Sequence, residues 1–290
     1  MDAIRRYAKP VLRRPRALLA FEGWNDACDA ASGAAAYLLG QLDAADPFAI
    51  IDPEEFFDFQ ARRPTVEIDE GGTRSLTWPT TRFYAIPLTA EDRDLVVVLG
   101  EEPSHRWKTF ARLVTQLLCE VDVEEAVLLG AFIGKVPHTR AVPIVGSATD
   151  RDLVLSHGLP TSSYEGPTGI VGVLLEACRE VGMPAISLWA ATPHYLAANP
   201  NPKAMLALLD AAADVMHFGF DRSELTTIVS EFTERVEAAV RNSGEFAEYV
   251  SELEDDESPE AAEGSAAARI DPALTHELVD EIEDFLRDQG

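Results

Sequence analysis

A lysine, a histidine and an arginine follow an apolar run in the stretch LLGAFIGKVPHTR, residues 128–140. Lys135, His138 and Arg140 could together hold an anion, because all three side chains can donate hydrogen bonds. The two glycines of the stretch could permit a close backbone approach or a positive φ. The alternative is a corner with two prolines whose lysine and arginine are simply solvated.

Two adjacent carboxylates, Glu101 and Glu102, begin the stretch EEPSHRW that ends at Trp107. Successive residues of a strand point to opposite faces, so at most one of these carboxylates can point into a cleft. That carboxylate could act as a general base or bind a ribose hydroxyl. The alternative is the solvated start of a helix, where acidic side chains are favoured by the helix dipole.

Glycines and a threonine open a predicted helix in YEGPTGIVG, residues 164–172. The backbone N–H groups around Thr168 and Gly169 would be unpaired there, and such groups form a ready anion site. No Walker lysine follows these glycines, so the motif alone is a weak signal. The alternative is a helix cap that packs closely against the sheet.

An aromatic and proline-rich loop follows in SLWAATPHYLAANPNPKA, residues 187–204. Trp189, His194 and Tyr195 could line a pocket or an interface between protomers. A packed loop that covers the domain's own core is an equal alternative.

The histidines do not indicate a metal site. His138 has no histidine or cysteine at ligand spacing, and His194 is 56 residues away, so we do not expect zinc. No stretch resembles a nucleophile elbow, a kinase signature or a dinucleotide fingerprint. We therefore assign no catalytic residue, no metal ligand and no cofactor from the sequence.

Short apolar runs alternate with helical patterns along residues 16–220. The runs predict strands at 16–23, 48–52, 73–78, 81–88, 94–100, 124–134, 141–150 and 183–192. Residues 73–78 and 81–88 are expected to form a hairpin or adjacent strands around Pro79, and Pro143 indicates an edge position or a bulge. Strands that alternate with helices of this length predict an α/β fold, a three-layer α/β/α sandwich with a mixed, mainly parallel sheet and additional C-terminal helices. Ligands of such sheets bind at the carboxyl ends of the strands, where the first three stretches are expected.

The chain divides by composition into five parts. An N-terminal arm (1–15) precedes the α/β domain (16–220), and an amphipathic helical extension (221–250) follows. Residues 251–270 are acidic and broken by proline, so they predict a flexible linker before a short C-terminal helix at 271–290. Residues 243–290 hold 16 acidic and 2 basic side chains, a net charge of −14 out of −26 for the 290 residues.

The negative charge argues against non-specific binding to nucleic acid or to an anionic membrane. The cysteines Cys28, Cys119 and Cys178 lie far apart, which is typical of reduced, buried thiols in a cytoplasmic protein. No apolar run of 18 residues exists, so no transmembrane helix is expected.

Three segments together carry a resemblance: LLAFEGWNDACDAASGAAAYL, GAFIGKVPHTRAVPIVGSAT and YEGPTGIVGVLLEACREVGMPAISLWAATPHYLAANPNPKA. Over residues 16–245 the chain resembles an actinobacterial member of the proteasome assembly chaperone 2 family. The resemblance implies a fold similar to nucleoside phosphorylases and, through eukaryotic members, a role in proteasome assembly. Archaeal relatives form homo-oligomers, but the family supplies no established active site to carry over.

One feature departs from that family. Some relatives contact proteasome rings through an ending of a hydrophobic residue, a tyrosine and any residue, whereas this chain ends FLRDQG. A docking role of the tail would therefore use the acidic linker and the face around Phe285.

These observations lead to two functional hypotheses. The first is a non-enzymatic assembly chaperone or adaptor that associates with itself and with proteasome subunits. The alternative is a nucleoside- or phosphate-binding enzyme of the phosphorylase, hydrolase or ATP-grasp ligase type. In that enzyme His138 or Glu101 would be the general acid or base, and Arg140 with the backbone of Thr168 and Gly169 would hold an anion.

Overall fold

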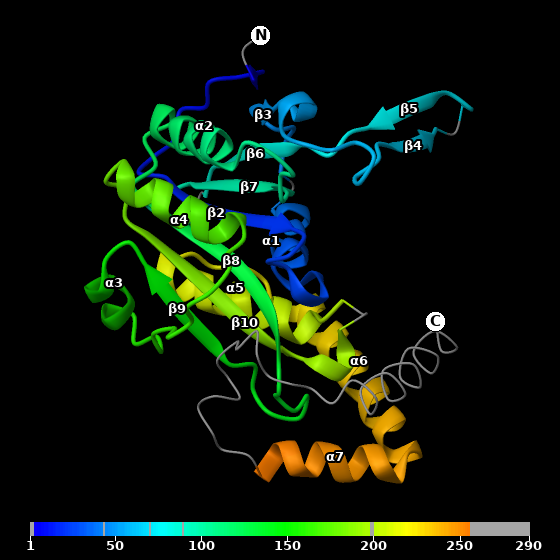
Figure 1. Ribbon diagram of the computed structural model, residues 1–290. Helices are drawn as coiled ribbons and strands as arrows, with labels where there is room; N and C mark the ends of the chain where they lie inside the picture. Colours follow the sequence, from blue (N-terminus) through cyan, green and yellow to red (C-terminus); the bar gives the residue numbers. More distant parts are fainter. Residues whose placement is uncertain (1–2, 43, 70, 89, 198–199, 256–290) are drawn as a thin grey trace.

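The computed structural model describes residues 3–42, 44–69, 71–88, 90–197 and 200–255 (Figure 1). An eight-stranded sheet forms the centre of the molecule. Across the sheet the strands are β1 (Ile4–Arg6), β3 (Ala49–Ile51), β6 (Thr81–Ile86), β7 (Leu95–Glu101), β2 (Arg16–Glu22), β8 (Glu125–Gly134), β10 (Ala185–Pro193) and β9 (Ile144–Ala148).

The four central strands, β7, β2, β8 and β10, are parallel to one another. The strands on either side of them, β6, β3 and β1 on one side and β9 on the other, pair antiparallel. The central strands are buried along most of their length, which explains their nearly continuous apolar runs. The mixed, mainly parallel sheet is therefore confirmed, and β9 lies at an edge as Pro143 predicted.

Helices cover both faces of the sheet, which confirms the three layers (Figure 1). One face packs against α2 (Trp107–Glu120) and α4 (Ile170–Glu180). The other face packs against α1 (Ala30–Gln41) and α5 (Pro202–Met216). The alanines of α1 let it approach the sheet and α5 closely, and Gly33 leaves room for Met205, whose Cε would lie 2.9 Å from a Cβ there.

One strand pairing differs from the prediction. The strand over 74–77, β5 (Arg74–Thr77), does not pair with β6 but with β4 (Thr65–Ile68), in a separate two-stranded hairpin. The side chain of Asp69 accepts a hydrogen bond from the N–H of Thr73 and stabilises the turn between β4 and β5. The hairpin extends from the β3–β6 side of the molecule (Figure 1). A short helix after β9, α3 (Arg151–Ser156), was also not predicted.

Two helices follow the sheet domain: α6 (Ser223–Asn242) and α7 (Gly244–Asp255). The amphipathic extension predicted over 221–250 thus contains a break, because Ser243 is extended at the end of α6. Helix α7 continues to Asp255, into the range whose composition predicted a linker. The remainder of that range and the helix predicted at 271–290 lie outside the described residues.

The cysteine prediction is correct for two of the three thiols. Cys28 and Cys178 are buried, and burial raises their pKa values to about 11 and about 12. Cys119 is exposed, because it lies on the solvent side of the amphipathic helix α2. All three cysteines are free.

Candidate functional site

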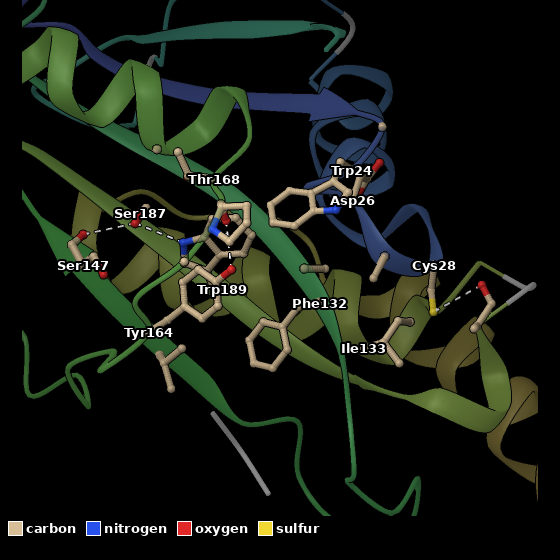
Figure 2. Close-up of a pocket in the computed structure, with 18 of the residues that line it drawn as sticks. Trp24, Asp26, Cys28, Phe132, Ile133, Ser147, Tyr164, Thr168, Ser187 and Trp189 are labelled. Carbon is tan, nitrogen blue, oxygen red and sulfur yellow. Dashed lines mark hydrogen bonds between the residues drawn. The ribbon is translucent and has the colours of Figure 1, made fainter. Parts of the chain in front are cut away.

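An open cleft of about 770 Å³ lies over the ends of β2 and β8 and over β9 and β10. Figure 2 shows the side chains of Trp24, Phe132, Tyr164 and Trp189 around this cleft. Each of the four comes from a different element: the loop after β2, strand β8, the loop before α4, and strand β10. The cleft is therefore built from segments that are far apart in the sequence, at the edge where α/β folds bind ligands.

Trp189 forms the middle of the cleft because the neighbouring strand has a glycine opposite it. Trp189 pairs in register with Gly130, and a Cβ at Gly130 would lie 2.6 Å from Cε3 of the indole. Nε1 of Trp189 donates a 3.1 Å hydrogen bond to Oγ of Ser187, which fixes the ring (Figure 2). Gly130 thus serves a close approach, as the sequence suggested for this glycine, but to an aromatic side chain.

Three large apolar side chains are exposed at the cleft. Trp24 has 59% of its surface exposed, Tyr164 has 39% and Ile133 has 38%. Exposed apolar groups that converge on one concavity are typical of a binding surface. None of the three is among the site residues predicted from the sequence, although Trp24 directly follows a predicted strand end, and an aromatic residue at that position is a signal for a site.

The backbone at one end of the cleft is unusual. Cys28 and Asp29 are consecutive non-glycine residues with left-handed φ values of 57° and 49°. Non-glycine residues rarely adopt this region, and those that do cluster at functional sites. Asp26 holds the segment by accepting hydrogen bonds from the N–H groups of Ala31 (2.6 Å) and Ser32 (3.2 Å). Burial raises the pKa of Asp26.

Glu102, a candidate from the sequence, stabilises the start of a helix. Its Oε1 accepts a 2.7 Å hydrogen bond from the N–H of Ile170, the first residue of α4, and a 2.8 Å bond from Nδ2 of Asn25. Gly169 lies against the same groups, since a Cβ there would be 2.3 Å from Oδ1 of Asn25 and 2.6 Å from Oε1 of Glu102. The N-terminus of α4 is therefore already satisfied by a carboxylate, while Thr168 lines the cleft beside it.

Glu101 points away from Glu102 and takes part in an ion-pair group. The guanidinium of Arg62 hydrogen-bonds to Glu101 and, at 2.7 Å, to Glu22 on the adjacent strand. Burial and then the charge of Glu101 raise the pKa of Glu22. Arg62 therefore offsets the repulsion between two carboxylates that are paired in register at the ends of β2 and β7.

The corner at 134–140 lies under the C-terminal helices and not at the cleft. His138 and Tyr195 are buried, and the hydroxyl of Tyr195 lies 2.8 Å from Nδ1 of His138. The same hydroxyl accepts a 2.7 Å hydrogen bond from the N–H of His138. Burial raises the pKa of Tyr195 and, with the charge of Lys203 as a second cause, lowers that of His138.

His194 joins the corner to α7. Its Nε2 lies 2.9 Å from the hydroxyl of Tyr249 on α7, and its Nδ1 lies 3.4 Å from the carbonyl oxygen of Gly134. Burial lowers the pKa of His194, and the charge of Lys135 adds to this effect. The apolar side chains that pack around the contact are Tyr195, Leu196, Phe232, Val236, Phe246, Val250 and Leu253.

Two basic side chains at the corner, Arg140 and Lys203, form hydrogen bonds with backbone carbonyl groups of the protein. Arg140 donates to the backbone carbonyl of Glu254, and Nζ of Lys203 donates to the carbonyl oxygens of His138 (2.5 Å) and Arg140 (2.7 Å). The cavity at the corner is small, with a volume of about 10 Å³ against about 770 Å³ for the cleft. The corner therefore forms the surface against which α6 and α7 pack.

The structure thus distributes the predicted site residues over three places. Thr168 and Trp189 line the cleft, with Glu102 and Gly169 directly beside it; Glu101 belongs to the group around Arg62; and Lys135, His138, Arg140, His194 and Tyr195 belong to the corner. Among the described residues that line the cleft there is no lysine, arginine or histidine. Two of these described lining residues are carboxylates, Asp26 and Asp29, which disfavour an anion such as phosphate.

The described residues contain no group of three or more histidine, cysteine, aspartate or glutamate side chains placed to hold a metal ion. Within the same part of the chain, every helix is too short or too polar to cross a bilayer.

Comparison with known proteins gives matches over most of the chain. The model of the PAC2 family matches residues 20–240. A PAC2 family protein from Streptomyces avermitilis is 46% identical, with a TM-score of 0.76 over 81% of this chain and 99% of that one. A proteasome-assembly chaperone homologue from Mycobacterium tuberculosis is 39% identical, with a TM-score of 0.75 over the same shares.

A more distant match concerns the fold alone. PbaB of Pyrococcus furiosus, an archaeal proteasome activator, is 21% identical, with a TM-score of 0.64 over 81% of this chain and 97% of that one. No curated protein gave a significant match.

Proposed function

The chain belongs to the PAC2 family, and from this premise we propose that it is a non-enzymatic assembly chaperone or adaptor that contacts proteasome subunits and associates with itself. The observation that carries the proposal is the similarity to the protein from Mycobacterium tuberculosis. That protein is a proteasome-assembly chaperone homologue, and the match covers 99% of its length. Relatives from Streptomyces and Mycobacterium also support the predicted actinobacterial branch. The likeness to nucleoside phosphorylases remains a prediction about the arrangement of the sheet and its helices.

The geometry supports a protein without catalysis. The side chains that could have carried chemistry have structural partners: Glu102 caps α4, and His138 and His194 hold Tyr195 and Tyr249. An enzyme of the phosphate-binding kind would need its general base and its cations at one cavity. Here Arg140 and Lys203 lie at the corner, where α6 and α7 pack, whereas the lining of the cleft is aromatic and carries carboxylates.

The proposal assigns the proteasome contact to the acidic C-terminal segment. Residues 243–290 hold 16 acidic and 2 basic side chains, a concentration of charge that favours fast, steered association with a basic surface. We also assign the protein to the cytoplasm, in keeping with its three free cysteines.

The test is capture of proteasome α-subunits of the same organism by the full-length protein, identified by mass spectrometry. The proposal predicts that α-subunits are retained and that deletion of 256–290 removes them. The deletion begins at 256 because Leu253 on α7 is buried against the body. Failure of the full-length protein to retain any α-subunit would contradict the proposal.

A ligand screen tests the non-enzymatic part separately. A ligand that binds only the folded state raises its melting temperature. We expect no shift with phosphate, nucleosides or ATP at millimolar concentration, and a clear shift would favour the enzyme hypothesis instead.

A further inference from the structure

Exposed apolar surface is concentrated at two places among the described residues. Twelve large hydrophobic side chains are exposed among all the described residues, and seven of these twelve belong to the cleft or to the β4–β5 hairpin with its base. The cleft exposes Trp24, Ile133 and Tyr164, and the hairpin with its base exposes Val66, Ile68, Leu76 and Trp78. Apolar patches of this kind on a water-exposed surface mark sites of association.

The hairpin has one apolar and one polar face. Val66 pairs in register with Leu76, and Ile68 pairs with Arg74, so these four side chains share a face. Val66, Ile68 and Leu76 are 52%, 63% and 55% exposed. We call these three residues with Arg74 the hairpin face.

The opposite face of the hairpin carries Thr65, Glu67, Ser75 and Thr77, with a 3.1 Å hydrogen bond from Oγ1 of Thr77 to Oε1 of Glu67. Polar side chains on this face suit solvent. An isolated two-stranded hairpin is only marginally stable in water, and three or more strands or a packing partner are normally needed. A surface that packs on the hairpin face would supply this support.

The cleft is complementary to the hairpin face in polarity and in charge. Its walls are aromatic and aliphatic, and its charged lining residues are carboxylates: Asp29, which is exposed, and Asp26, which is buried and accepts backbone hydrogen bonds. The hairpin face carries one charge, the cation of Arg74, which forms no ion pair with any of the described residues. Arginine beside apolar anchors is a common composition at the centre of protein interfaces, and aromatic rings also attract its guanidinium.

The two surfaces lie on different parts of the same molecule. The hairpin is inserted in the sequence between β3 and β6, whereas the cleft lies over β8, β10 and β9. In the sheet, β7 and β2 separate β6 from β8. In Figure 1 the hairpin points away from the β8–β10 side. A contact between such different patches is heterologous, so it joins one copy to the next head-to-tail.

We propose that the hairpin face of one copy occupies the aromatic cleft of the next copy, and that self-association of the protein is head-to-tail. The inference rests on the self-association proposed above and names the surfaces that perform it. Val66, Ile68 and Leu76 lie against the rings of Trp24, Phe132 and Tyr164, and Arg74 faces the carboxylate end of the cleft. Each copy then uses one hairpin and one cleft.

The test uses the full-length protein and three single variants at exposed positions: Ile68→Glu on the hairpin face, Trp24→Glu in the cleft, and Ser75→Glu as the matched control on the polar face. Mass is measured by light scattering and sedimentation at micromolar concentrations. We expect wild type and Ser75→Glu to be oligomeric. Ile68→Glu and Trp24→Glu should each weaken self-association about tenfold or more, as a buried charge at an interface centre does.

A mixing experiment separates this arrangement from every other. An equimolar mixture of Ile68→Glu and Trp24→Glu retains one intact hairpin and one intact cleft, so it should form a species of two chains and no larger one. A pair of hairpins packed on each other predicts instead that Trp24→Glu leaves the oligomer unchanged, and a different occupant of the cleft predicts a monomeric wild type. Either result overturns the proposal.

A second pair guards against loss of folding. If a variant melts earlier than wild type, Val66→Glu and Tyr164→Glu replace the first pair, and absence of the two-chain species in both mixtures overturns the proposal. No proteasome subunit takes part in these measurements. A failure of the hairpin contact is therefore distinguishable from a failure of the proposed chaperone function.

Discussion

The hydroxyl of Tyr195 accepts a 2.7 Å hydrogen bond from the main-chain N–H of His138 and lies 2.8 Å from Nδ1 of the same residue. The two residues are 57 positions apart, and both are buried. This contact fixes the corner after β8 against the segment that follows β10. Helix α7 packs against Tyr195 through Phe246, and the two ring centroids lie 5.0 Å apart. The basic and imidazole groups of the corner thus hold a helix in place.

Removal of that hydroxyl should destabilise the fold. Tyr195→Phe leaves the buried N–H of His138 without a partner, and we expect a loss of about 1–3 kcal/mol in the free energy of unfolding. Urea denaturation of the full chain measures the loss. Tyr7→Phe, at a tyrosine that is 62% exposed, is the matched control and should be neutral. Equal effects of both substitutions would show that the contact with His138 contributes nothing.

Stability should fall as the pH is lowered below the ordinary histidine pKa of 6.5. Burial lowers the pKa values of His138 and His194, so between pH 6.5 and those lowered values the unfolded chain binds protons that the folded chain does not. This part of the stability is present in full above the ordinary histidine pKa and decreases as the pH falls from there through the lowered pKa values, by at most about 1.4 kcal/mol per pH unit for each histidine.

Carboxylates also titrate in this range, and burial raises the pKa values of Glu22 and Asp26, which acts in the opposite direction. The double variant His138→Asn, His194→Gln isolates the histidine part. Its free energy of unfolding, measured against pH, should fall less between pH 7 and pH 5 than that of wild type, or should rise. An identical slope in both proteins would contradict the assignment.

A methyl group at Gly130 should disturb the cleft. Gly130→Ala places a Cβ 2.6 Å from the indole of Trp189, and we expect a loss of about 1–3 kcal/mol because the ring must move. Gly40→Ala is the control of opposite sign: apart from the neighbouring backbone of its own helix, nothing lies within 4 Å of a Cβ at this position, so the substitution should increase the free energy of unfolding by about 0.5–1 kcal/mol. Thermal unfolding measures the stability of Gly130→Ala, and tryptophan fluorescence measures the displacement of the indole. A Gly130→Ala variant with wild-type stability and fluorescence would contradict this geometry.

Glu102 should contribute to stability through α4. Glu102→Ala removes the acceptor for the N–H of Ile170 and for Nδ2 of Asn25, and we expect a cost of about 1–2 kcal/mol, typical of a lost helix cap. Glu165→Ala, at an exposed position in the loop before α4, should be neutral in the same denaturation series. If Glu102→Ala proved as stable as wild type, the carboxylate would have another role.

The fold class could be predicted because its signals are local. Continuous apolar runs such as Leu95–Gly100 identify strands that are buried on both faces, and the spacing of Phe110, Val114, Leu117 and Leu118 identifies α2. Strand β4 was not predicted because it is only four residues long and all four are exposed. Val66 and Ile68 therefore do not belong to an apolar run like those of the buried strands. The prediction then assigned β5 to the wrong partner.

The site could be predicted only in part, because it depends on contacts between distant segments. The carboxyl end of the sheet was the correct place to search, and Thr168 and Trp189 do line the cleft there. Trp24 and Tyr164 join them only through the order of the strands and the course of the loop before α4. Likewise, nothing local to His138 indicates that Tyr195 and α7 will cover it.

The most direct test of the proposed function is assembly of α-rings from purified α-subunits, followed by native mass with and without the full-length protein. A proteasome-related chaperone should bind the free subunits and increase the rate or the yield of rings, while it is absent from the finished particle. Unchanged assembly together with no detectable binding to the α-subunits would contradict the proposal.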